Sequence, residues 1–177
     1  MIQVFDKSFE VFITAEEIQQ EIEALGASIN EDYAGKEVTF VSVLNGAFMF
    51  TSDLIKHIHL DCEVSFVKVS SYAGTESRGQ LDELIGLNTY PRGKHVIIVE
   101  DVVDTGVTIE RIRKLFEDQG CLSVKVCTLL LKPAAFKGKL KPEYVGFSIP
   151  NAFVVGYGLD YNERGRNLDS IYQIRES

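Results

Sequence analysis

The stretch Val96–Ile109, VIIVEDVVDTGVTI, predicts a buried strand, a tight turn and the start of a helix. The unbroken β-branched run Val96–Val99, with Glu100 at its end, is typical of a parallel strand that is covered on both faces. From Ile109 onward the apolar residues recur with helical spacing, and Gly120 is a plausible stop for that helix. We interpret the rest of the chain as the support of this strand–turn–helix unit.

Two kinds of chemistry meet where this strand ends. Glu100 and Asp101 place two carboxylates at its carboxyl edge, and the small-residue turn Asp104-Thr105-Gly106-Val107-Thr108 follows. A turn that opens a helix collects N–H groups and the positive end of the helix dipole, which suits a phosphate. The acids would repel that phosphate unless they faced a sugar hydroxyl or a metal ion. The stretch therefore predicts a phosphate cup beside a diol or Mg²⁺ site, and a solvated acidic turn is the alternative. The glycine spacing matches neither G-x-G-x-x-G nor G-x-x-x-x-G-K, so dinucleotide and P-loop sites lack support.

Length and composition limit the class of protein. With 177 residues, 45% hydrophobic and 25% charged, the chain suits one domain, residues 1–177, with a substantial core. The net charge of −8 disfavours nucleic acid and anionic membranes as partners. No signal segment is evident and no apolar run approaches about 20 residues, which predicts no membrane span and a cytoplasmic location. Cys62, Cys121 and Cys127 lack paired or metal-ligand spacing, and we interpret them as core thiols in a reducing compartment.

Strands and helices alternate along the chain. Other segments with strand patterns are Phe9–Ile13 (expected at a sheet edge), Val38–Leu44, Cys62–Ser70, Ser123–Leu131 and Tyr144–Ile149. Thr14 and Glu17 fit the capping box of a first helix. A second helix is expected after the turn Asn45-Gly46-Ala47. The alternation predicts an α/β fold with a doubly wound, mainly parallel sheet flanked by helices. Ligands of such sheets bind beyond the carboxyl ends of the strands.

Several other positions are candidates for chemistry. Lys132 closes an apolar strand at the same edge as the acids if the strands are parallel, and a merely solubilising lysine is the alternative. The glycine turn after Leu44 repeats the geometry of the central unit or is an ordinary strand–helix loop. The polar segment 71–80 has the length of an active-site lid, with a disordered hairpin tip as its alternative. We expect His57 and His59 to be surface or capping residues, because no carboxylate or cysteine accompanies them at ligand spacing.

Residues 100–108, EDVVDTGVT, closely resemble the phosphoribosyl-pyrophosphate motif of type I phosphoribosyltransferases. Further segments resemble hypoxanthine(-guanine) phosphoribosyltransferases in the family's order. They are Leu44-Asn45-Gly46-Ala47, Ser71-Tyr72, Lys132-Pro133, Phe153-Val154 and Gly158-Leu159-Asp160-Tyr161-Asn162-Glu163 with Arg166. They span nearly the whole chain, and this combination separates the family from the orotate, adenine and uracil enzymes. The resemblance implies the type I phosphoribosyltransferase fold, with a small hood formed by the chain ends.

The resemblance also implies a reaction and a set of roles. The 5-phosphoribosyl group of phosphoribosyl pyrophosphate would move to N9 of a 6-oxopurine, releasing pyrophosphate. We expect this base to be hypoxanthine and also guanine. Glu100 and Asp101 would hold the ribose hydroxyls with Mg²⁺ nearby, and Asp160 would ligate a second Mg²⁺. Asp104 would act as general acid/base at N7, while Thr105, Gly106, Val107 and Thr108 would cradle the 5′-phosphate. Lys132 would donate to the 6-oxo group, Phe153 would stack on the base, and Val154 would offer backbone contacts.

The pyrophosphate end would be bound by other segments. Arg166 would bind pyrophosphate, Leu44-Asn45-Gly46 resembles the pyrophosphate loop, whose first peptide bond is often cis in relatives, and Ser71-Tyr72 resembles the tip of a closing lid. Asn45 departs from the lysine or arginine of many relatives, so a side-chain role there is open. We also expect a homodimer or homotetramer. The alternatives are a regulator of the same fold that binds nucleotides and RNA or DNA, an enzyme that prefers xanthine, and a non-catalytic protein, which would leave the clustered acids unexplained.

Overall fold

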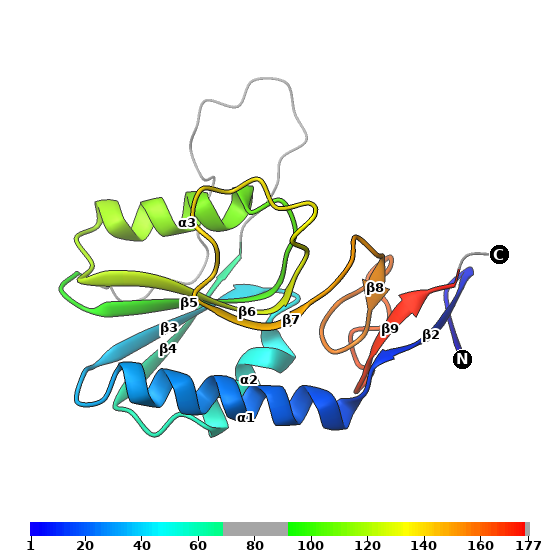
Figure 1. Cartoon of the computed structure of the whole chain (residues 1–177), viewed down its shortest axis with the longest axis horizontal. Coiled ribbons are helices and arrows are strands. Elements are labelled where there is room, and N and C mark those ends of the chain that lie inside the picture. Colours follow the sequence, from blue (N-terminus) through cyan, green and yellow to red (C-terminus); the bar gives the residue numbers. More distant parts are fainter. Residues whose placement is uncertain (69–91, 176–177) are drawn as a thin grey trace.

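Five parallel strands form the main sheet of the computed structural model, which describes residues 1–68 and 92–175 (Figure 1). Their order across the sheet is β4-β3-β5-β6-β7. Their bounds are Val38–Leu44 (β3), Cys62–Lys68 (β4), His95–Val103 (β5), Ser123–Leu131 (β6) and Tyr144–Ser148 (β7). The helices are Ala15–Asp32 (α1), Phe48–Lys56 (α2) and Val107–Asp118 (α3). The predicted α/β fold with a parallel sheet is confirmed.

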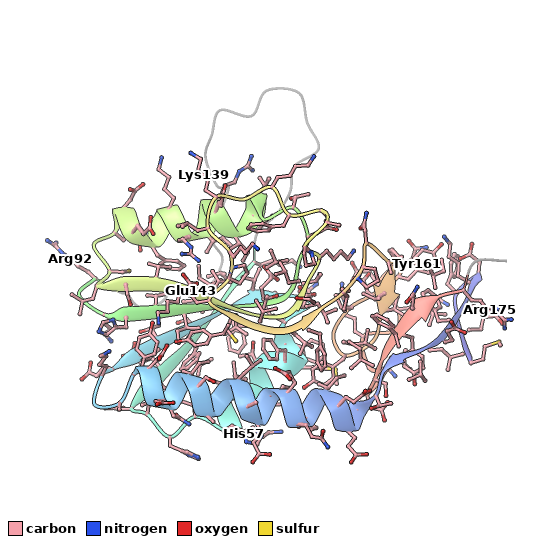
Figure 2. All side chains as sticks on the ribbon, viewed as in Figure 1. His57, Arg92, Lys139, Glu143, Tyr161 and Arg175 are labelled. Carbon is pink, nitrogen blue, oxygen red and sulfur yellow. The ribbon has the colours of Figure 1, made fainter. Side chains whose placement is uncertain are left out.

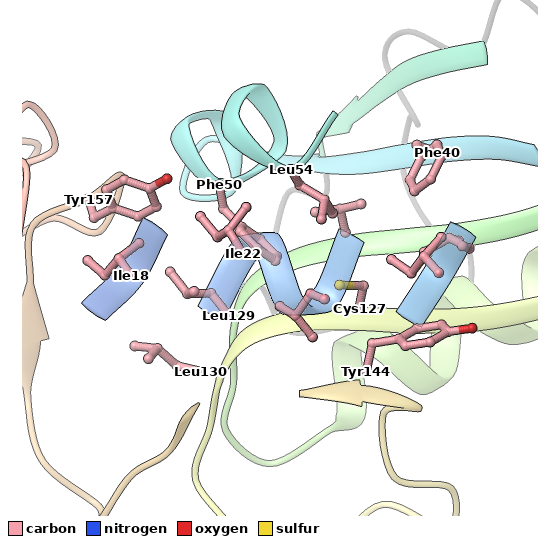
Figure 3. Packing of buried hydrophobic residues seen from close by; sticks show 14 of the residues in the cluster. Ile18, Ile22, Phe40, Phe50, Leu54, Cys127, Leu129, Leu130, Tyr144 and Tyr157 are labelled. Carbon is pink, nitrogen blue, oxygen red and sulfur yellow. The ribbon is translucent and has the colours of Figure 1, made fainter. Parts of the chain in front are cut away.

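The helices cover both faces of the sheet (Figure 1). α1 and α2 bury one face in a cluster that includes Ile22, Phe50 and Leu129, and Figure 3 shows these side chains packed together. α3 buries the other face through Ile109, Ile112 and Phe116. The chain passes from β3 through α2 outward to β4, and from β5 through α3 outward to β6. The winding direction therefore reverses between β3 and β5, and such a switch point is where doubly wound sheets bind ligands.

The helix boundaries follow from local sequence. The predicted capping box is present at the start of α1, where the Thr14 hydroxyl accepts from the Glu17 N–H and the Glu17 carboxylate accepts from the Thr14 N–H. At the end of α3, Gly120 takes a φ of +82°, a value that favours glycine, so it terminates the helix as expected. No helix in residues 1–68 and 92–175 is long and apolar enough to cross a membrane.

A second, antiparallel sheet joins the two ends of the chain. Its order is β1-β2-β9-β8, with bounds Ile2–Val4 (β1), Lys7–Ile13 (β2), Val154–Val155 (β8) and Ile171–Ile174 (β9). It lies beyond the carboxyl ends of the parallel strands (Figure 1), and Figure 2 shows Tyr161 beside it. This is the expected hood. The expectation that Phe9–Ile13 lies at a sheet edge holds in part: within this segment only Phe9 pairs with β1, and the residues after it pair with β9 alone.

Candidate active site

The central strand is longer than its apolar run. β5 continues past Glu100 to Val103, because β6 keeps pairing with it, matching Val103 with Leu131. The expectation that the strand ends at Glu100 is therefore corrected, since both acids lie inside β5. The ladder between β3 and β5 ends earlier, at Ser42 and Val99. Glu100 and Asp101 thus lie where the two strands part, at the switch point.

Glu100 and Asp101 form a close pair of carboxyl groups, of which Glu100 is buried and Asp101 is partly exposed. Glu100 is only 8% exposed. Burial, the charge of Asp101 and a hydrogen bond with Asp101 raise the pKa of Glu100 well above its usual value. Burial also raises the pKa of Asp101, although hydrogen bonds, including one from the Val102 N–H at 2.7 Å, and the charge of Arg166 act against it. Two acids held so close in a poorly solvated place are stabilised by a cation or by hydroxyl donors.

The turn after β5 presents backbone donors to solvent. α3 begins at Val107, its N-cap is Gly106 with a φ of +84°, and no side chain makes a capping hydrogen bond. Apart from a long contact of 3.5 Å from the Val107 N–H to the Thr105 hydroxyl, the first N–H groups of the helix have no side-chain acceptor within the described residues, which is the arrangement that binds phosphate. A cavity of about 280 Å³ opens here. It is lined by Val43, Glu100, Val102, Val103, Asp104, Thr105, Gly106, Thr108 and Ile109.

Asp104 and Lys132 meet at this edge of the sheet. The Nζ atom of Lys132 lies 3.3 Å from Oδ2 of Asp104, and the backbone N–H of Lys132 donates to the Val103 carbonyl at 3.0 Å. The Lys132 side chain is 12% exposed and that of Asp104 is 48% exposed. Asp104 therefore does not serve as the cap of α3, and Lys132 is not a solvated surface lysine. The expectation that Lys132 lies at the same edge of the sheet as the acids is confirmed, because β5 and β6 are parallel and Val103 pairs with Leu131.

The turn after β3 approaches the acids from the other side of the switch point. The Leu44–Asn45 peptide bond is cis, as the resemblance implies. Gly46 fits directly against the carboxylate of Asp101, so that a Cβ at Gly46 would overlap it. Asn45 itself is exposed. This turn thus brings backbone rather than a charged side chain to the acids.

The segment after β8 closes the site from the hood. The Nη2 atom of Arg166 lies 2.8 Å from Asp160 Oδ1 and 3.1 Å from Glu163 Oε2, while its Nη1 donates to the Gly158 carbonyl at 2.9 Å. The other oxygen of Asp160 accepts from the Glu163 N–H at 2.8 Å. Asp160 is thus already engaged by protein donors.

Phe153 lies in the hood with an exposed ring face. It is 44% exposed, and its ring packs edge-on against Tyr161 with centroids 5.7 Å apart and against Phe9 at 6.4 Å. Val154 follows it in β8, where it is buried and pairs with Gln173. The sequence argument identified Phe153 but not the aromatic frame that orients it. Because that frame comes from opposite ends of the chain, no local pattern could have revealed it.

Two further residues that support the site carried little sequence signal. The ring of Phe136, in the loop after β6, packs against Gly106 so closely that a Cβ there would collide with it. Tyr157 anchors the loop before Asp160, and only its two flanking glycines hinted at an unusual backbone. Ser71 and Tyr72, expected in a lid, lie outside the described residues. Within residues 1–68 and 92–175, no three His, Cys, Asp or Glu residues gather to hold a metal, so Glu100, Asp101 and Asp160 do not form a closed cage.

Comparison with known proteins assigns the family. Residues 13–162 match the phosphoribosyl transferase domain. The chain is 41% identical over 167 residues to a hypoxanthine-guanine phosphoribosyltransferase of Streptococcus pneumoniae, covering 94% of this chain and 93% of that protein. It is 43% identical over 162 residues to the one of Bacillus subtilis, covering 91% and 90%. A crystal structure of a hypoxanthine phosphoribosyltransferase from Staphylococcus aureus aligns with a TM-score of 0.88 and 42% identity, covering 94% of this chain and 91% of that one. The chain belongs to the phosphoribosyltransferase family, among its hypoxanthine-guanine members.

Proposed function

We propose that this chain is a hypoxanthine-guanine phosphoribosyltransferase of purine salvage. It transfers the 5-phosphoribosyl group of phosphoribosyl pyrophosphate to N9 of hypoxanthine or guanine, giving IMP or GMP and pyrophosphate. The relatives that cover nearly the whole chain carry this name. The observation that carries the proposal is the cavity at the switch point, where buried carboxyl groups, an uncapped helix N-terminus and the Asp104–Lys132 pair meet.

The Asp104–Lys132 pair fits the edge of a 6-oxopurine. Such a base carries O6 and N7 side by side on one edge. Lys132 donates to O6, and Asp104 accepts the N7 proton as N9 attacks C1′ of the ribose. Adenine would present an amino group to the Lys132 ammonium, so that two donors would face each other and the base would be rejected. Phe153 stacks on the base with its exposed face, and the backbone of Val154 contributes contacts.

The central strand β5 and the turn after it bind the ribose and the 5′-phosphate of the substrate. The N–H groups of residues 104–108 and the hydroxyls of Thr105 and Thr108 hold the 5′-phosphate. Glu100 and Asp101 accept from the ribose hydroxyls. As the bond between C1′ and the pyrophosphate oxygen breaks and the N9–C1′ bond forms, positive charge builds on the ribose. The buried carboxylates stabilise that charge, and the backbone of Leu44-Asn45-Gly46 and the guanidinium of Arg166 bind the departing pyrophosphate. We also assign Ser71 and Tyr72, which lie outside the described residues, to substrate binding at this end.

The acid pair also fits Mg²⁺. Magnesium is usually bound by one or two carboxylates together with waters and substrate phosphates rather than by a full protein cage. Glu100 and Asp101 supply such a pair, and Asp160 would ligate a second ion after release from Arg166. When bound, Mg²⁺ would neutralise the charge of the pyrophosphate leaving group.

The remaining proposals concern domain organisation, oligomeric state, location and partners. We propose one domain over residues 1–177, a homodimer or homotetramer, and a cytoplasmic location without nucleic acid partners. The family match over residues 13–162 and the net charge of −8 support the single domain and the lack of nucleic acid binding, respectively.

A panel of bases tests the proposal. Purified protein, Mg²⁺ and phosphoribosyl pyrophosphate are mixed with hypoxanthine, guanine, xanthine or adenine, and ultraviolet absorbance reports nucleotide formation. We expect turnover of hypoxanthine and guanine and almost none of adenine. A preference for xanthine would point to the xanthine-specific alternative. No turnover of any base, combined with nucleotide and RNA binding, would point to the regulator.

A further inference from the structure

The loop before Asp160 has a backbone that needs outside support. Gly156, Tyr157 and Gly158 take consecutive φ values of +98°, +48° and +96°. The two glycines adopt this region freely, but a residue with a Cβ is disfavoured there. A tyrosine holds such a conformation only where surrounding contacts fix it. The side chain of Tyr157 supplies those contacts.

Tyr157 is bound to helix α2 through Asp53. The tyrosine is 2% exposed, and Figure 3 shows its ring within the cluster that contains Ile18 and Phe50. Its hydroxyl donates to Asp53 Oδ2 at 2.5 Å. Gln19 of α1 donates to the same oxygen at 2.9 Å, and Lys56 lies 2.7 Å from Oδ1.

The charge of Asp53 is matched to this role. Burial alone would raise the pKa of Asp53, but the hydrogen bonds from Lys56, Tyr157 and Gln19 outweigh burial and hold the pKa below its usual value. Asp53 therefore stays ionised at neutral pH and accepts from the tyrosine as a charged partner. Hydrogen bonds to charged groups are stronger than those between neutral groups.

The bond between Tyr157 and Asp53 joins two segments that the proposed reaction needs together. α2, which carries Asp53, begins two residues after Gly46. Gly158, the next residue after Tyr157, packs its α-carbon against the Gly46 carbonyl, where a Cβ would overlap it. Gly158 is also hydrogen-bonded in both directions with Arg166, its N–H donating to the Arg166 carbonyl and its own carbonyl accepting from the guanidinium, each at 2.9 Å.

We propose that Tyr157 and Asp53 form a positioning pair that sets the Gly46 turn against the Arg166 loop and so shapes the pyrophosphate half of the site. The inference rests on the proposed function, because it assigns that half of the site to pyrophosphate. The base half depends on Lys132 and on the aromatic frame of Phe153, and within residues 1–68 and 92–175 no hydrogen bond or ring pair joins Tyr157 or Asp53 to them. Loss of the pair therefore weakens the binding of phosphoribosyl pyrophosphate and leaves the binding of the base unchanged.

The chain offers a matched control at the opposite end of the parallel sheet. Tyr144 is 7% exposed, its hydroxyl donates to Asp32 Oδ2 at 2.6 Å, and Lys125 lies 3.1 Å from the same oxygen. Asp32 is the last residue of α1, which ends at the amino edge of the sheet. Tyr144→Phe thus removes a buried tyrosine–aspartate bond of similar length without touching the site.

The experiment compares Tyr157→Phe, Asp53→Ala and Tyr144→Phe with the wild type in melting temperature, kcat and the KM of each substrate. Calorimetric binding of phosphoribosyl pyrophosphate supplies a readout that does not need turnover. We expect Tyr157→Phe and Asp53→Ala to lower the affinity for phosphoribosyl pyrophosphate about 10-fold, because a hydrogen bond to a charged group contributes roughly that factor. The KM for hypoxanthine should stay within about twofold. The double variant should be no worse than Asp53→Ala alone, since Asp53→Ala already removes the bond to Tyr157 together with those to Gln19 and Lys56.

Equal effects on both substrates, or equal effects of Tyr157→Phe and Tyr144→Phe, would overturn the positioning role and leave the proposed function intact. A wild type that neither binds phosphoribosyl pyrophosphate nor turns over would instead overturn the proposed function. Asp53→Asn refines the result, because its amide oxygen still accepts from Tyr157. Recovery of phosphoribosyl pyrophosphate affinity in Asp53→Asn relative to Asp53→Ala supports the pair, and no recovery contradicts it.

Discussion

Oδ2 of Asp104 lies 3.3 Å from Nζ of Lys132 at the edge of the cavity. Within residues 1–68 and 92–175, neither side chain makes another hydrogen bond. The carboxylate is about half exposed, whereas the ammonium is nearly buried. A buried ammonium beside an accessible carboxylate suits a purine base that enters from solvent, because the ammonium donates to one atom of the base while the carboxylate accepts a proton from another. Two predictions separate the roles of these residues.

Asp104→Asn should reduce kcat on the order of 10²-fold or more, because the amide cannot accept the N7 proton. The affinity for phosphoribosyl pyrophosphate and the melting temperature should change little, since α3 has no side-chain cap to lose. Steady-state kinetics and thermal unfolding measure these quantities. Turnover close to that of the wild type would mean that the proton acceptor lies elsewhere.

Lys132→Ala should raise the KM for hypoxanthine much more than the KM for phosphoribosyl pyrophosphate, because the ammonium faces only the base. The substitution also shortens the side chain, so Lys132→Met, which removes the same charge but keeps the length of the side chain, controls for lost packing. Both variants should behave alike. An equal rise in both KM values would show that Lys132 does not contact O6.

Secondary-structure elements were predictable where the signal was local. The Thr14 capping box, the glycine after α3 and the apolar run of β5 each depend on residues a few positions apart. The full extent of β5 was not predictable, because acidic residues ordinarily mark the end of a strand. Here the pairing with β6 carries the strand on to Val103. The neighbours of β2 were hidden for the same reason, since its partner β9 lies at the other end of the chain.

The same distinction applies to the site. The approach of Lys132 to the acids follows from the rule that parallel strands end at one edge. The packing of Gly46 against Asp101 and of Gly158 against Gly46 depends on how the hood meets the main sheet, which no spacing encodes. Those contacts require the three-dimensional structure.

Gly106→Ala tests the start of α3 as a phosphate-binding element. Alanine at a φ of +84° is strained, and its methyl group would displace the Phe136 ring. We expect the KM for phosphoribosyl pyrophosphate to rise about 10-fold or more and the melting temperature to fall. Gly35→Ala is the control, because Gly35 has a φ of +72° and open space around it, far from the cavity. An unchanged KM in Gly106→Ala would remove this turn from the phosphate site.

The whole molecule carries a net charge of −8, and yet its proposed substrate is a polyanion. Binding must therefore rely on local features, namely backbone donors, Arg166 and a divalent cation, rather than on the field of the protein. The hood and the main sheet face each other across the switch point, so these local features come from both ends of the chain.

Removal of the metal tests this arrangement at the scale of the whole enzyme. A chelator should abolish turnover, and added Mg²⁺ should restore it, because Glu100 and Asp101 otherwise face the phosphates without a cation. The unfolding temperature should stay nearly constant, since no protein cage closes around the ion within the described part of the chain. Full activity in excess chelator would contradict the role of Mg²⁺.

The stoichiometry of the reaction tests the transfer itself. Hypoxanthine and phosphoribosyl pyrophosphate are mixed with the protein and Mg²⁺, and IMP and pyrophosphate are quantified in the same samples over time. The site described above, with the base held by Asp104 and Lys132 against the ribose carbon, predicts one IMP for each pyrophosphate. Pyrophosphate released without IMP, or no consumption of hypoxanthine, would contradict the account.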